Sequence, residues 1–249
     1  MSSSLSSLLQ AAGIALDGRA QERLLAYQEI LAKASTLQNL TALRSPEVFL
    51  REGILDSLLA WQALGVPPQG VVDVGSGGGL PALVWCAAGL TTDAVLIEAE
   101  RRKVEFLRAA AAELALAVKV IWGRAEEEAR GALRDRARLV TARALAGAPV
   151  AVEVCGGLVQ PGGVLCLLKG EPGKAAAEAE QAAPVAGRMG FGKVEMRRYR
   201  LEQDVERTLL LYRKARPTPP DRPASFARLR REFPSRKRLL EREGAQQGE

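Results

Sequence analysis

Residues 71–81 read Val71-Val72-Asp73-Val74-Gly75-Ser76-Gly77-Gly78-Gly79-Leu80-Pro81, and they predict a strand, a loop and a helix in succession. Three β-branched residues around Asp73 predict a short buried strand. Four glycines among the next five residues leave a turn almost without side chains. Pro81, followed by apolar helix formers, predicts the start of a helix. A bare loop between a strand and a helix directs backbone N–H groups toward a ligand.

The glycine spacing indicates which ligand this loop suits. A dinucleotide fingerprint, Gly-x-Gly-x-x-Gly, would need its third glycine at Leu80 or Ala82. The pattern Gly75-x-Gly77-x-Gly79 after an acidic strand end instead resembles the loop of class I S-adenosylmethionine-dependent methyltransferases. Their cofactor carries an amino-acid moiety and no phosphate. A glycine-rich turn that binds nothing is the alternative.

Downstream of the loop, short apolar runs alternate with helical stretches. We expect strands at 94–98, 118–122, 138–143 and 163–169, and helices at 81–88, 101–114, 148–158 and 174–183. This alternation predicts an α/β fold with a parallel sheet covered on both faces. Two consecutive strand-like stretches, 192–201 and 205–212, predict an antiparallel edge hairpin. The whole resembles the Rossmann-like, doubly wound sheet of class I methyltransferases, whose last strand is antiparallel.

The segments on either side of this pattern differ from it. Apolar residues at helical spacing in 3–34, with a break near 13–18, predict two helices, and Ser45-Pro46 predicts the start of another that runs to about Trp61. We therefore expect a helical N-terminal extension at 1–64, a methyltransferase domain at 65–215 and a basic C-terminal tail at 216–249.

Composition excludes several classes of function. No uncharged apolar run approaches the roughly 18 residues of a membrane span, and the N-terminus lacks the pattern of a signal peptide. We expect a soluble, cytoplasmic monomer. The chain has three cysteines without Cys-x-x-Cys spacing and no histidine. The usual general base and the commonest zinc ligand are therefore missing, and we expect no metal.

The net charge of +6 is concentrated at the C-terminus. Residues 213–249 hold 11 Lys/Arg and 5 Asp/Glu, whereas the rest of the chain holds 24 of each sign. This excess fits contacts with a phosphate backbone. A solvated, disordered tail is the alternative.

Four positions at expected strand ends carry candidate chemistry, because ligands bind beyond the carboxyl ends of parallel strands. Glu98 can accept hydrogen bonds from both ribose hydroxyls of an adenosine. Ala125-Glu126 can face the N1 and amino groups of adenine, although acidic residues also favour any first helical turn. Arg143 and Lys169 can bind a carboxylate or RNA phosphates, or can simply be surface charges.

Several further motifs, taken in order, make the resemblance specific. They are Asn39-Leu40-Thr41, Ile54-Leu55-Asp56-Ser57-Leu58, Lys103-Val104-Glu105-Phe106-Leu107, Arg124-Ala125-Glu126, Arg143-Ala144 and Leu168-Lys169-Gly170. Together with the glycine loop they resemble the bacterial small-subunit ribosomal RNA guanine-N7 methyltransferases, the family also called glucose-inhibited division protein B. The resemblance runs from about Asn39 to Lys169. Glu52-Gly53 departs from it, because the family usually has a basic residue and a histidine there, and so does Ala82, at a position that is often glycine.

The resemblance implies a cofactor, S-adenosylmethionine, and a partner, the 530 loop of 16S ribosomal RNA in the small ribosomal subunit. Together with the loop pattern it assigns cofactor binding to Asp73, Gly75, Gly77, Gly79, Leu80, Glu98, Ala99, Glu100, Ala125, Glu126 and Arg143. Candidates for substrate binding are Arg143, Lys169, Arg228, Arg230, Arg231, Arg236, Lys237 and Arg238, and candidates for catalysis are Asn39, Asp56 and Arg143. Guanine N7 has a lone pair and no proton to lose, so the missing histidine is no obstacle. A nicotinamide-dependent oxidoreductase, an RNA-binding module and another nucleic-acid methyltransferase remain the competing hypotheses.

Overall fold

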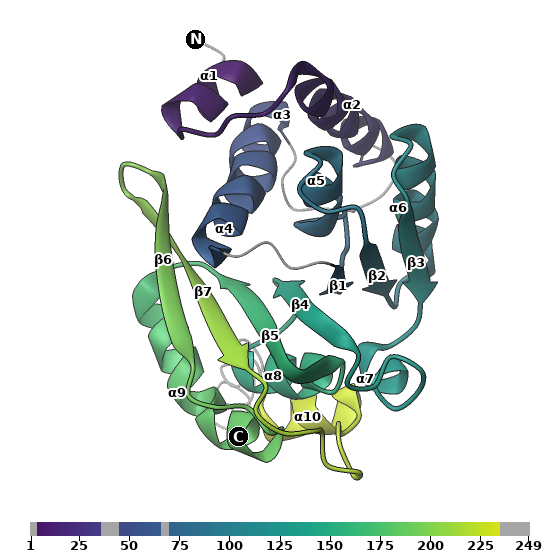
Figure 1. The fold of residues 1–249 in the computed structure, drawn as a ribbon, viewed down its shortest axis with the longest axis vertical. Coiled ribbons are helices and arrows are strands. Elements are labelled where there is room, and N and C mark those ends of the chain that lie inside the picture. The colour runs from purple at the N-terminus through teal and green to yellow at the C-terminus, as the bar shows by residue number, and fades with distance from the viewer. Residues whose placement is uncertain (1–3, 36–44, 66–69, 235–249) are drawn as a thin grey trace, which may run out of the picture.

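The computed structural model describes residues 4–35, 45–65 and 70–234. Seven strands form one sheet in the order β3-β2-β1-β4-β5-β7-β6 (Figure 1). The strands are β1 Val71–Val74, β2 Ala94–Glu98, β3 Val118–Trp122, β4 Ala137–Arg143, β5 Val159–Lys169, β6 Glu195–Glu202 and β7 Val205–Arg213. The first five are parallel, and β7 runs antiparallel to both β5 and β6.

Alternating side chains divide the core into two halves, one on each face of the sheet. In β5, Cys166 and Leu168 belong to the first half, while Leu165 and Leu167 belong to the second. The period of two follows from the pleat of the strand. Both halves are apolar, so helices must cover both faces.

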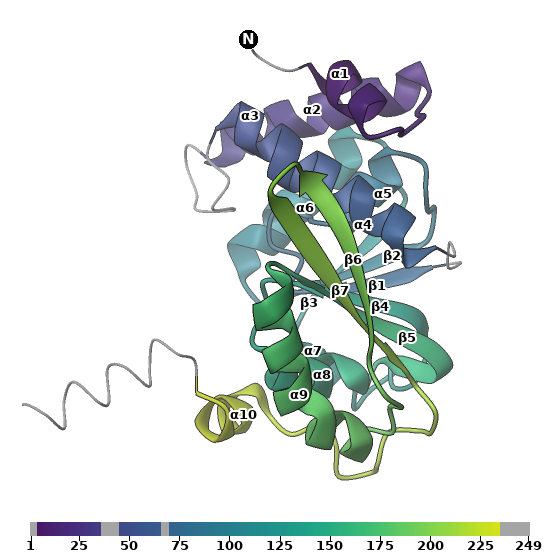
Figure 2. The same ribbon diagram turned by 90° about the vertical axis from the view of Figure 1, so that its left-hand side faces the viewer.

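The first face is covered by the helices of the N-terminal half of the chain (Figures 1 and 2). These are α1 Leu5–Ala11, α2 Gly18–Ser35, α3 Pro46–Val48, the π-helix η1 Phe49–Leu55, α4 Asp56–Leu64, α5 Ala82–Ala87 and α6 Arg101–Glu113. Trp85 on α5 is fully buried among them, and its indole N–H donates to the Ser57 carbonyl at 2.7 Å. The expected N-terminal extension thus shares a core with the sheet.

The second face is covered by α7 Ala125–Glu128, α8 Ala148–Gly156, α9 Pro172–Arg188 and α10 Phe226–Glu232. In Figure 1 these four helices lie at the bottom of the molecule, opposite α1 to α5. Arg188 of α9 and Glu232 of α10 form an exposed ion pair at 3.8 Å. The C-terminal part of the described chain therefore packs on the body of the protein.

The α/β class, the parallel sheet and the antiparallel last strand are confirmed. The ends of several elements differ from expectation. β5 begins at Val159, because Val159 pairs with Ala137 ahead of a register shift. α9 continues through Pro184, whose missing N–H falls on an exposed turn of the helix. The helix expected from Ser45 is interrupted by the π-helix η1.

No helix within the described ranges is both long and apolar enough to cross a membrane. In the same ranges, no three His, Cys, Asp or Glu side chains come close enough to hold a metal ion.

Candidate active site at the carboxyl ends of the strands

The glycine loop lies where the strand order reverses, since β1 has β2 on one side and β4 on the other. Open α/β sheets bind ligands at this point. The Gly75 N–H donates to the Ile97 carbonyl at 2.8 Å, which ties the loop to the end of β2. Gly75 and Gly79 have φ values of +69° and +98°. A Cβ at Gly75 would lie 2.7 Å from Leu145 Cδ1, so a side chain there would meet both backbone strain and a clash.

Glu98 at the end of β2 holds the loop in place. Its Oε2 accepts the N–H of Gly77 at 2.9 Å, and its Oε1 accepts the N–H of Glu100 at 2.9 Å. The residue is 7% exposed. An ionised carboxylate has about four acceptor positions, so two remain for a ligand.

A small cavity of about 80 Å³, here called the edge cavity, lies against the second face of the sheet next to this loop. Its wall includes five of the predicted cofactor residues, namely Gly75, Glu98, Ala99, Ala125 and Glu126. The other predicted cofactor residues, Asp73, Gly77, Gly79, Leu80, Glu100 and Arg143, are not part of this wall.

Glu126, at the start of α7, is 5% exposed. Its Oε1 accepts the backbone N–H of Phe226, the first residue of α10, at 3.0 Å. The Phe226 ring is also part of the wall of the edge cavity. Sequence reasoning missed this residue, since nothing in the pattern of the C-terminal segment shows where α10 packs.

Asp73 points to the first face of the sheet and is fully buried. Its Oδ1 accepts the hydroxyl of Thr141 at 2.7 Å. Its Oδ2 and the Nη1 of Arg143 are both buried, and neither has a hydrogen-bond partner within the described part of the chain. Burial raises the pKa of the Asp73 carboxyl to about 7. A buried acceptor and a buried donor, each without a hydrogen-bond partner, call for a polar ligand beside the loop.

A second cavity of about 390 Å³, here called the polar cavity, opens at the ends of β4 and β5. Its wall includes Asp56, Arg143, Lys169, Glu178, Tyr199 and Arg207. Arg143, which was predicted to bind both the cofactor and the substrate, therefore lies in the wall of the polar cavity. Its charge also acts on the Asp73 carboxyl. Lys169 donates to Glu178 at 2.7 Å and to the Ala146 carbonyl at 3.0 Å.

Asp56 contacts several other residues in the wall of the polar cavity. Its carboxylate accepts the Tyr199 hydroxyl at 2.7 Å and lies 3.2 Å from Arg143 Nη2 and 3.7 Å from Arg207 Nε. Burial, followed by the charge of Asp56, raises the pKa of Tyr199 far above its usual value, so its hydroxyl stays protonated as a donor. Tyr199 and Arg207 face each other across the hairpin of β6 and β7. They were not predicted, because strand pairing alone brings them to Asp56.

The departure from the family pattern at Glu52-Gly53 lies beside this cavity. The Glu52 carbonyl accepts a hydrogen bond from Arg143, and the Glu52 carboxylate lies 3.7 Å from Arg207. A Cβ at Gly53 would lie 2.7 Å from the Phe49 ring. The ring of Phe49 thus fills the space in which a side chain at position 53 would begin.

The remaining predictions concern the two ends of the chain. Arg228, Arg230 and Arg231 are exposed on α10, and Arg230 lies 5.8 Å from the centre of the Phe226 ring. The structure does not bring them into the wall of the polar cavity. Asn39, Arg236, Lys237 and Arg238 lie outside the described residues.

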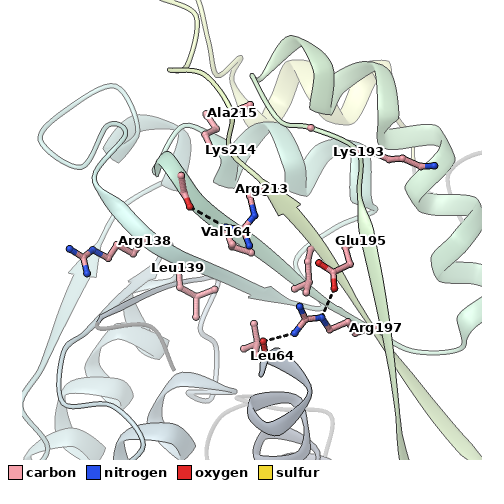
Figure 3. Close-up of a pocket in the computed structure, with 13 residues that line it drawn as sticks. Leu64, Arg138, Leu139, Val164, Lys193, Glu195, Arg197, Arg213, Lys214 and Ala215 are labelled. Carbon is pink, nitrogen blue, oxygen red and sulfur yellow. Dashed lines mark hydrogen bonds and ion pairs between the residues drawn. The ribbon is translucent and has the colours of Figure 1, made fainter. Parts of the chain in front are cut away.

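A larger cavity of about 600 Å³ lies at the opposite edge of the sheet, near the start of β4 (Figure 3). Arg197, in its wall, is already bound by Glu195 at 2.6 Å and by the Leu64 carbonyl at 2.6 Å. Arg197 therefore joins β6 to the end of α4, and this cavity contains none of the predicted site residues.

Comparison with known proteins agrees with the geometry of the strand ends. A family model described as rRNA small subunit methyltransferase G matches residues 20–197. A ribosomal RNA small subunit methyltransferase G from Moorella thermoacetica is 35% identical over 78% of this chain and 82% of its own length. The protein of the same name from Symbiobacterium thermophilum is 33% identical over 85% of this chain and 89% of its own length.

Among solved structures, that of cofactor-bound Rv0187 from MTB aligns with a TM-score of 0.53 and 17% identity. The alignment covers 78% of this chain and 91% of that protein. At this identity the likeness concerns the fold alone.

Proposed function

Because the chain belongs to the rRNA small subunit methyltransferase G family, we propose that it transfers a methyl group from S-adenosylmethionine to N7 of a guanine in the 530 loop of 16S ribosomal RNA. The observation that carries the cofactor assignment is the edge cavity, where Glu98 and Glu126 lie beside a loop in which a Cβ at Gly75 would come within 2.7 Å of Leu145. When bound, the cofactor supplies a methyl group on a positively charged sulfur.

The purine and ribose fit the second face of the sheet. Ala125 and Glu126 would bind the adenine through a backbone N–H and a carboxylate oxygen. The two remaining acceptor positions of Glu98 would take the ribose hydroxyls. The loop between Gly75 and Gly79 allows the ligand to lie close to the backbone.

The amino-acid end fits the first face. Asp73 Oδ2 and Arg143 Nη1 are a buried acceptor oxygen and a buried donor nitrogen without hydrogen-bond partners within the described structure. They complement the ammonium and carboxylate of the methionine moiety. A dinucleotide has no such zwitterion, which argues against the oxidoreductase alternative.

The polar cavity is the proposed site of the target guanine. Its volume of about 390 Å³ falls within the usual range for small-ligand sites, about 300–1,000 Å³. It adjoins Arg143, so base and methyl donor would meet at that residue. The N7 lone pair attacks without a general base, and the protein's task is to hold the two reactants in line. Methylation leaves a positive charge on the base, which the Asp56 carboxylate would stabilise.

An unpaired base is the expected target. The major groove of A-form RNA, where N7 lies, is too deep and narrow for side chains to read. The exposed arginines of α10 supply positive charge for the RNA backbone. A ribosomal RNA substrate is consistent with the expected cytoplasmic location.

The test is transfer of tritiated methyl groups to 16S ribosomal RNA, followed by mapping of N7-modified guanines. Naked RNA and assembled small subunits should be compared, because the sequence does not decide between them. We expect one modified guanine in the 530 loop. Salt-sensitive RNA binding without S-adenosylmethionine affinity would support the RNA-binding module instead. Methylation at another base would favour a different nucleic-acid methyltransferase.

A further inference from the structure

The helix α10 lies against α8 on the second face (Figure 1), outside residues 20–197 that the family model matches. The segment that leads into it is firmly attached. Arg222 pairs with the buried carboxylate of Glu153 at 2.9 Å, and the Ala224 N–H donates to the same oxygen at 2.8 Å. Arg134 donates to the carbonyls of Thr218, Pro219 and Arg222 at 2.7–2.8 Å. These bonds fix where α10 begins.

Two side chains of α10 that face the body of the protein differ in burial. Leu229 is fully buried in the second half of the core. Phe226, one turn earlier, is only half-buried and contributes its ring to the wall of the edge cavity. The guanidinium groups of Arg124 and Arg230 lie 5.7 Å and 5.8 Å from the centre of this ring. These two cations restrict the position of the Phe226 ring.

Glu126 connects this ring to the expected purine. Its Oε1 accepts the Phe226 N–H, whereas its Oε2 makes no hydrogen bond within the described part of the chain. One carboxylate can therefore serve α10 and a purine amino group at the same time. The edge cavity, at about 80 Å³, is small for a ligand of this size, so its walls must fit closely or yield. The ends of β1 to β3 cannot yield without disrupting the sheet, whereas the half-buried side chain of Phe226 lies outside the sheet and can adjust.

We propose that Phe226 is a cofactor-binding residue whose ring forms the outer wall of the purine site, so that S-adenosylmethionine binding and the docking of α10 stabilise each other. This inference rests on the proposed function and adds to it a residue outside the matched family segment. Coupling between two binding events is reciprocal. Cofactor binding thus also holds Arg228, Arg230 and Arg231 in a fixed arrangement on α10.

The test is calorimetric titration of the full chain with S-adenosylmethionine, in the absence of RNA. Phe226→Ala should raise the Kd about 10-fold, the usual scale for losing an aromatic contact with a base. Phe226→Leu, which keeps the apolar bulk, should give a smaller increase and guards against failure to fold. Phe233→Ala is the matched control, because Phe233 ends the same helix and packs on the same core but is not in the cavity wall.

Hydrogen exchange supplies a second readout that does not depend on any variant. The amides of α10 should become more protected when S-adenosylmethionine is added to the unmodified protein. The inference alone is overturned if the unmodified protein binds the cofactor and both Phe226 variants bind it within about two-fold as well. Equal losses in the Phe226→Ala and Phe233→Ala variants would also overturn it, since that would show general loosening of α10. No binding by the unmodified protein would overturn the proposed function together with the inference.

Discussion

The hydroxyl of Tyr27 on α2 donates a hydrogen bond to the carbonyl oxygen of Gly78, 51 residues later in the chain. Tyr27 is fully buried, and its ring packs edge-on against Phe49 at a centroid distance of 5.5 Å. Burial raises the pKa of this phenol far above its usual value, so it remains a donor at any working pH. The N-terminal helices therefore help to hold the glycine loop in place.

Tyr27→Phe is expected to lower the free energy of unfolding by about 1–3 kcal/mol, because the Gly78 carbonyl loses its buried donor. It should also raise the Kd for S-adenosylmethionine, since the glycine loop loses the hydrogen bond that holds Gly78 in place. Urea unfolding and calorimetry measure the two effects. Tyr212→Phe is the matched control, because the buried Tyr212 hydroxyl has no partner among the described residues. If the two variants behave alike, the bond to Gly78 has no special role.

The glycine loop shows how much of the site the sequence can predict. Gly75, Glu98 and Ala125-Glu126 were predicted as neighbours, and all of them lie in the wall of the edge cavity. This was possible because parallel strands place their carboxyl ends at one edge, so position along the chain is enough to place each residue.

The partners of these residues could not be predicted in the same way. Tyr27, Tyr199 and Phe226 reach the site by packing of α2, by pairing of β6 with β7 and by docking of α10. None of these contacts has a local signal. The tail composition could not show that Leu229 is a core residue.

The Asp73 carboxyl should make stability depend on pH. Its pKa rises from the ordinary 3.8 to about 7, chiefly through burial. Between these values the folded protein keeps a proton that the unfolded chain has lost. The free energy of unfolding should therefore fall as the pH rises from about 4 to about 7, by at most about 4 kcal/mol, and then level off.

Asp73→Asn should remove this slope, because an amide does not titrate. Urea unfolding of both proteins from about pH 5 to about pH 8 measures the difference. Above about pH 7 the ionised carboxylate should bind the cofactor ammonium, so the Kd of the unmodified protein should fall as the pH rises through this range. Parallel stability curves for the two proteins would show that the carboxyl does not titrate in this window.

Gly75→Ala should abolish cofactor binding more readily than folding. The new Cβ would lie 2.7 Å from Leu145 Cδ1, at the wall of the edge cavity, and φ at this position is +69°. Gly13→Ala is the matched control, because its φ is +65° and a Cβ there would meet nothing within 4 Å. Both variants should lose about 1 kcal/mol of stability from backbone strain. Only Gly75→Ala should fail in calorimetry with S-adenosylmethionine, and equal binding by both would show that the loop does not touch the ligand.

Asp56→Asn should reduce the rate of methyl transfer by about 10-fold to 100-fold. The amide keeps the size of the side chain but removes the negative charge that would face the positively charged methylated base. The same carboxylate forms ion pairs with Arg143, at 3.2 Å, and with Arg207, at 3.7 Å. Steady-state kinetics on small subunits would measure kcat and KM, and calorimetry would measure the Kd for the cofactor.

Two further variants separate the effect of the Asp56 charge from the effect of its structural contacts. Tyr199→Phe removes the 2.7 Å hydrogen bond but leaves the carboxylate, so its effect on kcat should be smaller. Asp204→Asn removes an exposed carboxylate at the tip of the hairpin and should change neither constant. If Asp56→Asn weakens cofactor binding as much as it slows methyl transfer, then Asp56 acts by positioning Arg143 toward the cofactor. If kcat falls while the Kd for the cofactor is unchanged, the lost interaction is one made in the transition state, as expected for a charge that stabilises the methylated base.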